Sequence, residues 1–311
     1  MTGQTPLCYK ESIGGETVIR LNYRVLEPWQ NQPISQILRK QLGFSALRLK
    51  SLRAAQDSVL LDGHSVPLYL RPVRGQMLTV CLPEDPPSPV EPVEGPLHLV
   101  YEDQHLVIVD KAPGMAVHPG PGHHGDTLGN LLTWHYQSQG EHHLFRPVNR
   151  LDRSTSGLVC VAKHAYAAEV MGRELKQGNF HKVYLAVCEG IPQQLNGTVD
   201  APIGRRAGSV LEREVRPDGK QAVTHYEALG GNHGRSLLRV EPETGRTHQI
   251  RVHMAWLGHP LTGDFLYGTE APELIPRAAL HAYGLRFFHP ITGQPLSFRA
   301  PLPQDMRRLL E

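Results

Sequence analysis

A proline-rich stretch constrains this chain more than any other feature. Six prolines fall within residues 83–96. Proline fixes the backbone angle φ and has no amide hydrogen to donate, so such a stretch forms an extended, semi-rigid spacer and not a helix or a central strand. The sequence therefore predicts a small domain over residues 1–83, a linker over 84–96 and a larger domain over 97–311.

Length and cysteine usage bound the class of protein. A chain of 311 residues can bury a core in each of two domains without disulfide bonds or structural metal ions. No apolar run approaches the roughly 18 residues that span a bilayer, and the first residues lack a secretory pattern. The four cysteines include no CxxC pair, which favours free thiols in a reducing compartment. We expect a cytoplasmic protein with no membrane partner.

The charge is unevenly distributed. The net charge is only +2, but residues 1–83 hold 10 Lys/Arg against 5 Asp/Glu. Residues 146–182 hold 7 bases against 3 acids, whereas residues 84–95 hold 4 acids and no base. Two basic blocks favour a polyanionic partner such as RNA. A solvated surface with no such partner remains the alternative.

The small domain is predicted to contain two short helices followed by a hairpin. Apolar residues three or four apart predict the first helix, and Leu47, Leu49 and Leu52 are the apolar positions of the second. In chain order the predictions are a helix from Pro33 to Gly43, a helix capped by Ser45, a strand at Val59–Leu61, a turn at Asp62-Gly63 and a strand at Met77–Val80.

The larger domain is predicted to have an α+β fold, because strands and helices alternate irregularly and strands predominate. Strands are predicted at Leu97–Tyr101, His105–Asp110, Gly157–Ala162, His181–Glu189, Ser236–Glu241, Leu285–Phe288 and Pro295–Phe298. Helices are predicted at Ala165–Lys176 and Thr247–Leu257, with Thr247 as the N-cap of the second. Asp218-Gly219 predicts a further hairpin turn.

The segment NRLDRSTSGLVCVAKH, residues 149–164, is the first candidate site. Asp152 lies between Arg150 and Arg153, and neighbouring cations favour an ionised carboxylate. A loop of hydroxyl residues and glycine ahead of an apolar strand can hold active-site groups. Taken alone, an Asp between two arginines is more often a surface ion pair.

The segment FHKVYLAVCEG, residues 180–190, is predicted to be a strand. Its period of two puts Lys182, Tyr184, Ala186 and Cys188 on one face. The small neighbour Ala186 leaves room for a flat ligand to stack on Tyr184. An ordinary strand aromatic is the alternative.

The segment TGRTHQIRVHMAWLGHPLTGD, residues 244–264, is predicted to contain a helix that begins after a turn at Gly245. His248 and Arg251 are three residues apart, so they are expected to share one helix face. A cation there can point at a carboxylate in a cleft. The alternative is a solvent-facing arginine.

Together the three segments resemble the RluA-type pseudouridine synthases. The order RLDRxTSG, KxYxAVxxG and GRTHQIRVH…LGHPLxGDxxYG carries the resemblance, and LVYEDQHLVIVDKAPGMAVHPG at 99–120 extends it. The resemblance spans about residues 97–300. It departs at Asn149, where the family commonly has histidine. The pattern LRLKSLRAAQDSVLLDGHSVPLYLRPVRGQMLTV, which ends at Val80, loosely resembles the small ribosomal-protein-like RNA-binding module of the S-four type.

The resemblance implies a pseudouridine synthase fold, with a mixed, mainly antiparallel central sheet and a cleft. It implies isomerisation of uridine to pseudouridine in structured RNA by a monomer that uses no cofactor and no metal. Asp152 takes the essential catalytic role, Tyr184 stacks on the target base and assists a proton transfer, and Arg251 pairs with Asp152. Arg150 fills the gap left by a flipped uridine. The RNA-binding residues implied with it are Arg150, Arg153, Lys182 and His248.

Two other functions compete with this one. A metal enzyme is suggested by 18 histidines, but no HExxH occurs and His248 and His253 are five apart, which does not align them on a helix. A non-catalytic RNA-binding protein on the same fold is the stronger alternative; loss of Asp152, Tyr184 or Arg251 would indicate it. Family analogy favours ribosomal RNA over transfer RNA as the substrate.

Overall fold

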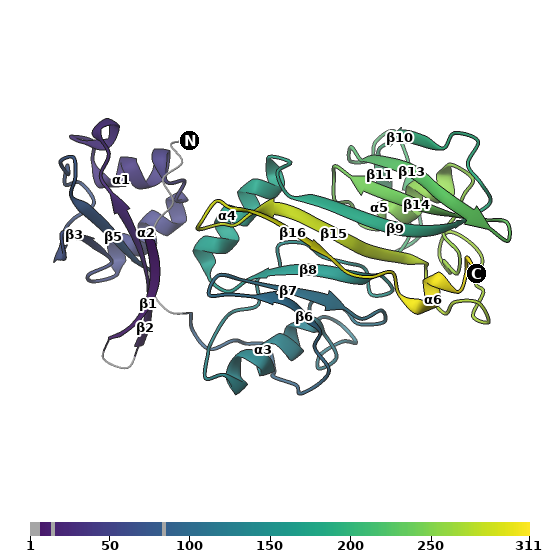
Figure 1. The fold of residues 1–311 in the computed structure, drawn as a ribbon, viewed down its shortest axis with the longest axis horizontal. Coiled ribbons are helices and arrows are strands. Elements are labelled where there is room, and N and C mark those ends of the chain that lie inside the picture. The colour runs from purple at the N-terminus through teal and green to yellow at the C-terminus, as the bar shows by residue number, and fades with distance from the viewer. Residues whose placement is uncertain (1–6, 14–15, 83–84) are drawn as a thin grey trace.

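The computed structural model describes residues 7–13, 16–82 and 85–311. Two separate sheets dominate it, one in the N-terminal part and a longer one in the C-terminal part (Figure 1). The first sheet is antiparallel and has the strand order β1-β2-β5-β3-β4. Its strands are β1 (Leu7–Ile13), β2 (Glu16–Arg24), β3 (Val59–Leu61), β4 (His64–Ser65) and β5 (Met77–Leu82).

Short helices complete the N-terminal part. A 3-10 turn at Glu27–Trp29 precedes α1 (Ile34–Gln36), which continues as a π-helical segment to Gln41, and α2 spans Ala46–Ala54. The predicted cap is confirmed, because the Ser45 hydroxyl accepts a hydrogen bond from the amide of Arg48 at 3.1 Å. Leu47 is the exception among the predicted apolar positions: it is 77% exposed.

The second sheet has nine strands and is antiparallel except where β15 runs parallel to β8. Its order is β10-β13-β14-β9-β15-β8-β7-β6, with β16 paired to β15, and β11 and β12 form a separate two-stranded ribbon. The strands are β6 (Leu99–Glu102), β7 (Leu106–Lys111), β8 (Ser156–Ala162), β9 (His181–Glu189), β10 (Asn196–Asp200), β11 (Ile203–Arg205), β12 (Arg213–Val215), β13 (Val223–Asn232), β14 (Arg235–Pro242), β15 (Leu280–Phe288) and β16 (Pro295–Arg299). The α+β fold with a mixed, mainly antiparallel sheet is thus confirmed.

Four helices accompany this sheet: α3 (Leu128–Ser138), α4 (Ala165–Lys176), α5 (Gln249–Trp256) and α6 (Gln304–Arg307). Thr127 and Asn130 form a reciprocal capping box at the start of α3, which satisfies amides that the helix leaves unpaired. Within the described ranges, no helix combines the length and the apolarity needed to cross a bilayer.

The central strands carry a core on each face of the sheet, because successive side chains alternate between the faces. On one face Val107, Val159 and Ala186 pack with residues of α3 and α5. On the other face Leu106 and Leu158 pack with residues of α4 and β16. The candidate site residues lie on the first of these faces.

The N-terminal part packs directly against α4. Tyr166 of α4 lies in the same apolar cluster as Tyr23 and Phe44, and the rings of Phe44 and Tyr166 are 4.6 Å apart between centroids. The guanidinium of Arg173 donates to the carbonyl of Gly43 at 2.8 Å, and Ser45 donates to the carboxylate of Glu169. This contact fixes the small domain beside the end of the long sheet, as Figure 1 shows.

The described part of the linker, residues 85–96, contains no helix or strand, as the prolines predict. It is nevertheless held against the C-terminal part. Asp85 forms a bidentate ion pair with Arg146, with both nitrogen–oxygen distances at 2.5 Å. The Asn130 side chain of α3 donates to the carbonyl of Glu91 at 2.8 Å. The linker is therefore a strap along the larger domain and not a free tether.

Candidate active site

Asp152 lies on a short loop that leads into β8. At Gly157, φ is +111°, and a Cβ atom there would collide with the backbone of Ala282 on the parallel neighbour β15. Only glycine allows the strand to leave the loop in this way. The loop backbone is also closed by a hydrogen bond from the amide of Thr155 to the carbonyl of Asp152 at 3.1 Å.

Asn149, the departure from the family pattern, anchors the start of this loop. Its side-chain nitrogen donates to the carbonyl of Leu158 at 3.1 Å, and its oxygen accepts from the amide of Cys160 at 2.8 Å. Asn149 is 7% exposed, so these bonds replace water in a buried place. The amide thus ties the Asp152 loop to β8.

We expect Asn149→Ala to lower the free energy of unfolding by about 1–3 kcal/mol, because a buried amide and a buried carbonyl lose their partner. Urea denaturation measures this. The control is Asn196→Ala at an exposed strand position, where a change within about 0.5 kcal/mol is expected. Equal effects of the two substitutions would contradict the anchoring role.

Lys111, at the end of β7, supports the same loop from beneath. The side chain is buried at 1% exposure. Burial first, and then the charge of Arg277, lower its pKa to about 7. Its Nζ donates to the carbonyls of Ala112 (2.8 Å), Met115 (2.8 Å) and Arg153 (3.4 Å). Lys111 therefore holds the backbone next to Asp152, a role that sequence reasoning missed.

A cavity of about 330 Å³ opens beside this loop. Six of the seven predicted site residues line it, although they come from three segments far apart in the chain. They are Arg150, Asp152, Lys182, Tyr184, His248 and Arg251. Arg153 is the exception: it is exposed, does not line the cavity, and its Nε donates to the carbonyl of Gly114 at 2.8 Å.

Arg251 reaches Asp152 but is bound more closely to Asp264. Its Nη1 is 3.6 Å from Asp152 Oδ2, whereas Nε and Nη2 lie 2.7 and 2.6 Å from the two oxygens of Asp264. The bidentate pairing is therefore with Asp264, which is completely buried. Burial opposes the charge of Arg251, but the hydrogen bond and charge of Asp264 raise the pKa of the guanidinium above its ordinary value.

Asp152 keeps its carboxylate open toward the cavity. The side chain is 22% exposed, and among the described residues no side chain hydrogen-bonds to it. Its nearest neighbours are the guanidinium of Arg251, at 3.6 Å from Oδ2, and the imidazole of His248, whose Nε2 is 3.9 Å from Oδ2. A carboxylate whose neighbours lie at these distances remains available to a ligand.

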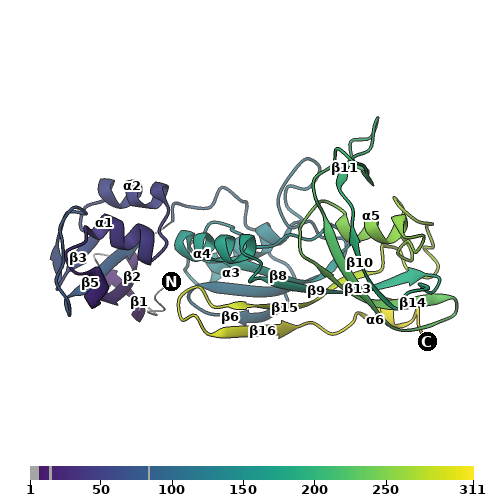
Figure 2. The ribbon, with the colours of Figure 1, turned by 90° about the horizontal axis from the view of Figure 1, so that it is seen from above.

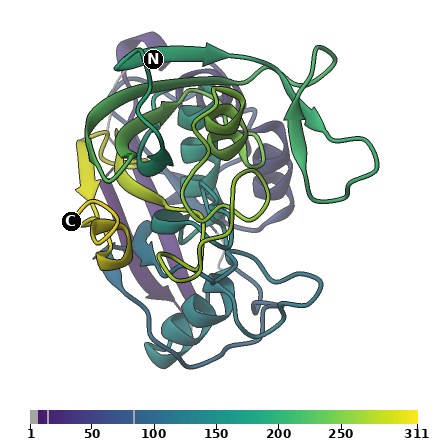
Figure 3. The ribbon, with the colours of Figure 1, turned by 90° about the vertical axis from the view of Figure 1, so that its right-hand side faces the viewer.

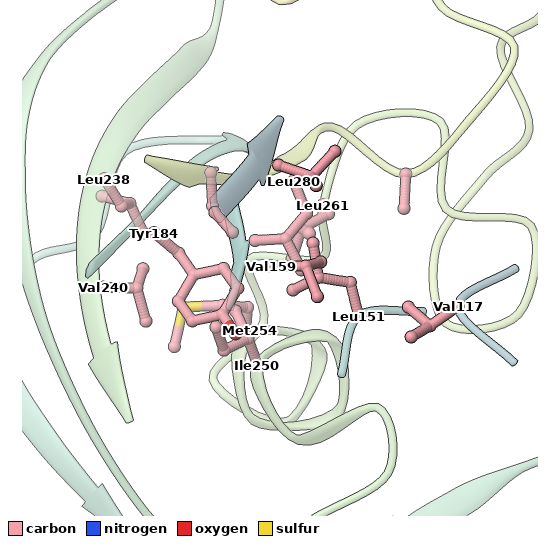
Figure 4. Close-up of a cluster of buried hydrophobic side chains, with 14 of the residues drawn as sticks. Val117, Leu151, Val159, Tyr184, Leu238, Val240, Ile250, Met254, Leu261 and Leu280 are labelled. Atoms are coloured by element: carbon pink, nitrogen blue, oxygen red, sulfur yellow. The ribbon is translucent and has the colours of Figure 1, made fainter. Parts of the chain in front are cut away.

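Tyr184 is placed on the cavity face of β9, as the period of two predicts. Figure 4 shows its ring among Val240, Ile250 and Met254. The residue is 8% exposed, and burial, followed by the charge of Asp152, raises the pKa of its hydroxyl. Tyr184 is therefore a neutral phenol with one side in the core and one at the cavity.

The predicted start of the helix is wrong. Thr247 is exposed and is not the N-cap. The N-cap is His248, which has left-handed backbone angles, φ +59° and ψ +19°. The side chain of Gln249 fixes this turn instead, accepting from the hydroxyl of Thr244 at 2.7 Å and from the amide of Arg246 at 2.9 Å. His248 is thus off the helix, although it still faces Asp152.

Lys182 lies at the edge of the cavity and donates to the carbonyl of Thr244 at 3.4 Å. Burial lowers its pKa. Arg246, which sequence reasoning passed over, also lines the cavity and is exposed. Sequence reasoning also assigned no role to Asp264 and Tyr267. A signal for them was present, because they fall in the LTGD and YG patterns after the predicted helix.

The chain is similar to known RNA pseudouridine synthases. Residues 105–256 match the family model described as RNA pseudouridylate synthase. The chain is 41% identical over 274 residues to the uncharacterized RNA pseudouridine synthase YjbO of Bacillus subtilis, covering 87% of this chain and 96% of that protein. It is 38% identical over 280 residues to ribosomal large subunit pseudouridine synthase D of Xanthomonas campestris, covering 86% of this chain and 84% of that protein.

The solved structures show the same fold. Human RNA pseudouridylate synthase domain containing 1 superposes with a TM-score of 0.56 and 29% identity, over 66% of this chain and 83% of that one. The family match, the relatives and the shared fold define an RNA-modifying enzyme of the pseudouridine synthase class. The chain belongs to the RNA pseudouridylate synthase family.

Proposed function

We propose that Asp152 is the catalytic carboxylate of this RNA pseudouridine synthase, with Tyr184 and Arg251 as its partners in the cavity. The observation that carries the proposal is the convergence of these three side chains, from residues 152, 184 and 251, on one cavity. Its volume of about 330 Å³ is at the small end of the roughly 300–1,000 Å³ typical of ligand pockets, as expected for a single nucleotide.

The reaction requires the target base to leave its stack before it can be turned over and rejoined through carbon 5. Extrusion costs a few kcal/mol and is cheapest in loops. Arg150 is exposed at the edge of the cavity, where a planar guanidinium can replace lost stacking. Tyr184 then supplies a ring for the uracil, and Asp152, which lines the same cavity, can reach the reacting nucleotide.

We propose ribosomal large-subunit RNA as the substrate, in the cytoplasm, with the protein acting as a monomer. Support for the substrate comes from the relative in Xanthomonas campestris, which is named for the ribosomal large subunit. The test is to incubate purified protein with transcripts of large-subunit ribosomal RNA and of transfer RNA, and to map pseudouridines by carbodiimide-dependent stops. Modification of transfer RNA alone would contradict the proposed substrate. Binding with no conversion of either RNA would favour the non-catalytic alternative.

We also propose that the N-terminal domain contacts the RNA through the exposed bases of its helical part. Arg39, Lys40, Lys50 and Arg53 are all exposed. In Figure 2, α2 and α5 lie on the upper side of the molecule, whereas β16 and α6 lie on the lower side. Helix α2, which carries Lys50 and Arg53, therefore lies on the same side as the helix that borders the cavity.

RNA affinity is expected to fall linearly with salt on a log–log plot, because each neutralised phosphate releases counterions. The double variant Lys50→Gln/Arg53→Gln should reduce the magnitude of the slope by about 1.5, given about 0.7–0.9 per contact. The control Arg307→Gln/Arg308→Gln removes two exposed charges from the opposite side. Filter binding at several salt concentrations measures both, and equal slopes would contradict the proposed contact.

A further inference from the structure

His248 stands between Asp152 and a tyrosine that the resemblance did not assign. Its Nδ1 is 2.8 Å from the hydroxyl of Tyr267, and its Nε2 is 3.9 Å from Oδ2 of Asp152. The resemblance implies an RNA-binding role for His248. Its ring also lies beside the carboxylate of Asp152, so the position of the imidazole hydrogen matters.

The hydroxyl of Tyr267 determines where that hydrogen lies. It accepts a hydrogen bond from the amide of Arg213 at 2.9 Å, at the start of β12. Its own hydrogen then needs an acceptor, and among the described residues His248 Nδ1 is the one at hydrogen-bond distance. If Nδ1 carried the hydrogen instead, no group among the described residues would accept the phenolic hydrogen. This arrangement favours the tautomer with the imidazole hydrogen on Nε2.

The surrounding charges agree with this tautomer. Burial first lowers the pKa of His248, with Arg251 and Arg213 acting in the same direction and Asp152 and Asp264 opposing them. The ring is therefore neutral at neutral pH. An Nε2–H points a positive hydrogen at the carboxylate of Asp152, whereas the other tautomer would point a lone pair at it.

The tyrosine is itself held rigidly by elements on two sides. Its ring lies 5.1 Å from the guanidinium carbon of Arg251, and its hydroxyl is tied to the β11–β12 ribbon through Arg213. Figures 2 and 3 show this ribbon projecting from the body of the molecule beside α5. The hydrogen bonds thus run from Arg213 of the ribbon through Tyr267 to His248.

We propose that His248 is a positioning residue for Asp152. As a neutral imidazole with its hydrogen on Nε2, fixed by Tyr267, it donates to the Asp152 carboxylate and orients it when a nucleotide fills the cavity and excludes water. This inference rests on the proposed function, because it requires Asp152 to be the reacting carboxylate. The 3.9 Å separation is longer than a hydrogen bond, and catalytic hydrogen bonds can tighten when the nucleotide binds.

Two substitutions at His248 separate a donor from a purely structural residue. Glutamine places an amide nitrogen near the position of Nε2, whereas asparagine is too short to reach it. The backbone at φ +59° favours the reverse order, because asparagine tolerates the left-handed region far better than glutamine does. A hydrogen-bond donor role predicts a higher rate for His248→Gln than for His248→Asn. A purely conformational role predicts the reverse.

We expect the single-turnover rate to fall by no more than about tenfold in His248→Gln and by about 100-fold in His248→Asn. The larger loss is that expected when a reacting group is misplaced. RNA dissociation constants should stay within about twofold in both. A rate for His248→Asn equal to or above that for His248→Gln would overturn the proposal. If no rate is measurable even for the unmodified enzyme, the proposed function fails, and the tautomer measurement below still tests the geometry.

The tautomer is measured without turnover. Long-range proton–nitrogen spectra of the protein with ¹⁵N-labelled histidine distinguish the two forms, and loss of one signal in His248→Gln assigns it. We expect hydrogen on Nε2 in the unmodified protein and a mixture of tautomers in Tyr267→Phe, which keeps the ring but loses the hydroxyl. Hydrogen on Nδ1 in the unmodified protein, or an unchanged tautomer in Tyr267→Phe, would overturn the proposal.

Discussion

Asp152→Asn is expected to lower the rate of pseudouridine formation by at least about 10³-fold while leaving RNA affinity within a few-fold of the unmodified protein. The substitution keeps the shape of the side chain, and the amide oxygen can still face Arg251. The amide cannot act as a nucleophile or a base at neutral pH. When a group acts only in the chemical step, its loss lowers the reaction rate but leaves binding unchanged.

The measurement is tritium release from carbon 5 of uridine in labelled RNA, beside a filter-binding curve. Asp57→Asn is the matched control: Asp57 is exposed in the N-terminal domain and has φ +53°, a conformation that asparagine accepts well. Its turnover should be unchanged. Residual turnover of Asp152→Asn within tenfold of the unmodified enzyme would remove Asp152 from its proposed role and favour a non-catalytic RNA-binding protein.

Local patterns predicted most of the elements of the larger domain. The strand His181–Glu189 and the helix Ala165–Lys176 have the predicted bounds, because apolar periodicity and a terminating glycine define both from neighbouring residues alone. The strand β2 was missed, although Ile19, Leu21 and Tyr23 are buried in alternation. This alternation of apolar residues is visible in the sequence and could have predicted the strand.

The packing of distant segments against one another could not be predicted from the sequence. The packing of Tyr166 against Phe44 joins residues that no local pattern relates, so the docking of the small domain on α4 was not predicted. The N-cap was misassigned because Thr247 has the better capping side chain, whereas the turn is fixed by the buried hydrogen bonds of Gln249.

The partner of Arg251 shows the same limit at the site. The position of Arg251 in the sequence predicts a cation that points into the cleft. It does not show which of two carboxylates that cation pairs with. The structure gives the closer pair to Asp264, 13 positions further on, with Asp152 at 3.6 Å. Arg251 is therefore a fixed charge supported from behind, and the substitution that tests this arrangement lies outside the cavity.

Asp264→Asn is expected to destabilise the protein by about 3–5 kcal/mol, because it leaves the buried guanidinium of Arg251 without its ionised partner. Asp264 is completely buried, and its Oδ1 also accepts from the amide of Leu266 at 3.0 Å. The loop that carries Tyr267 should therefore loosen together with Arg251. Where the variant remains folded, we expect a lower chemical rate, since both Arg251 and His248 lose support while Asp152 is intact.

Asp218→Asn provides the matched control, because Asp218 forms a bidentate pair with Arg216 in the same geometry, at 2.5 and 3.0 Å, but is 71% exposed. Exposed pairs contribute little, so its unfolding curve should hardly move. Urea denaturation of both variants compares the pairs directly, and single-turnover rates at low temperature separate folding from chemistry. Equal stability losses would show that burial does not determine the strength of the Arg251–Asp264 pair. A stable Asp264→Asn variant with the unmodified rate would show that Arg251 needs no support to act on Asp152.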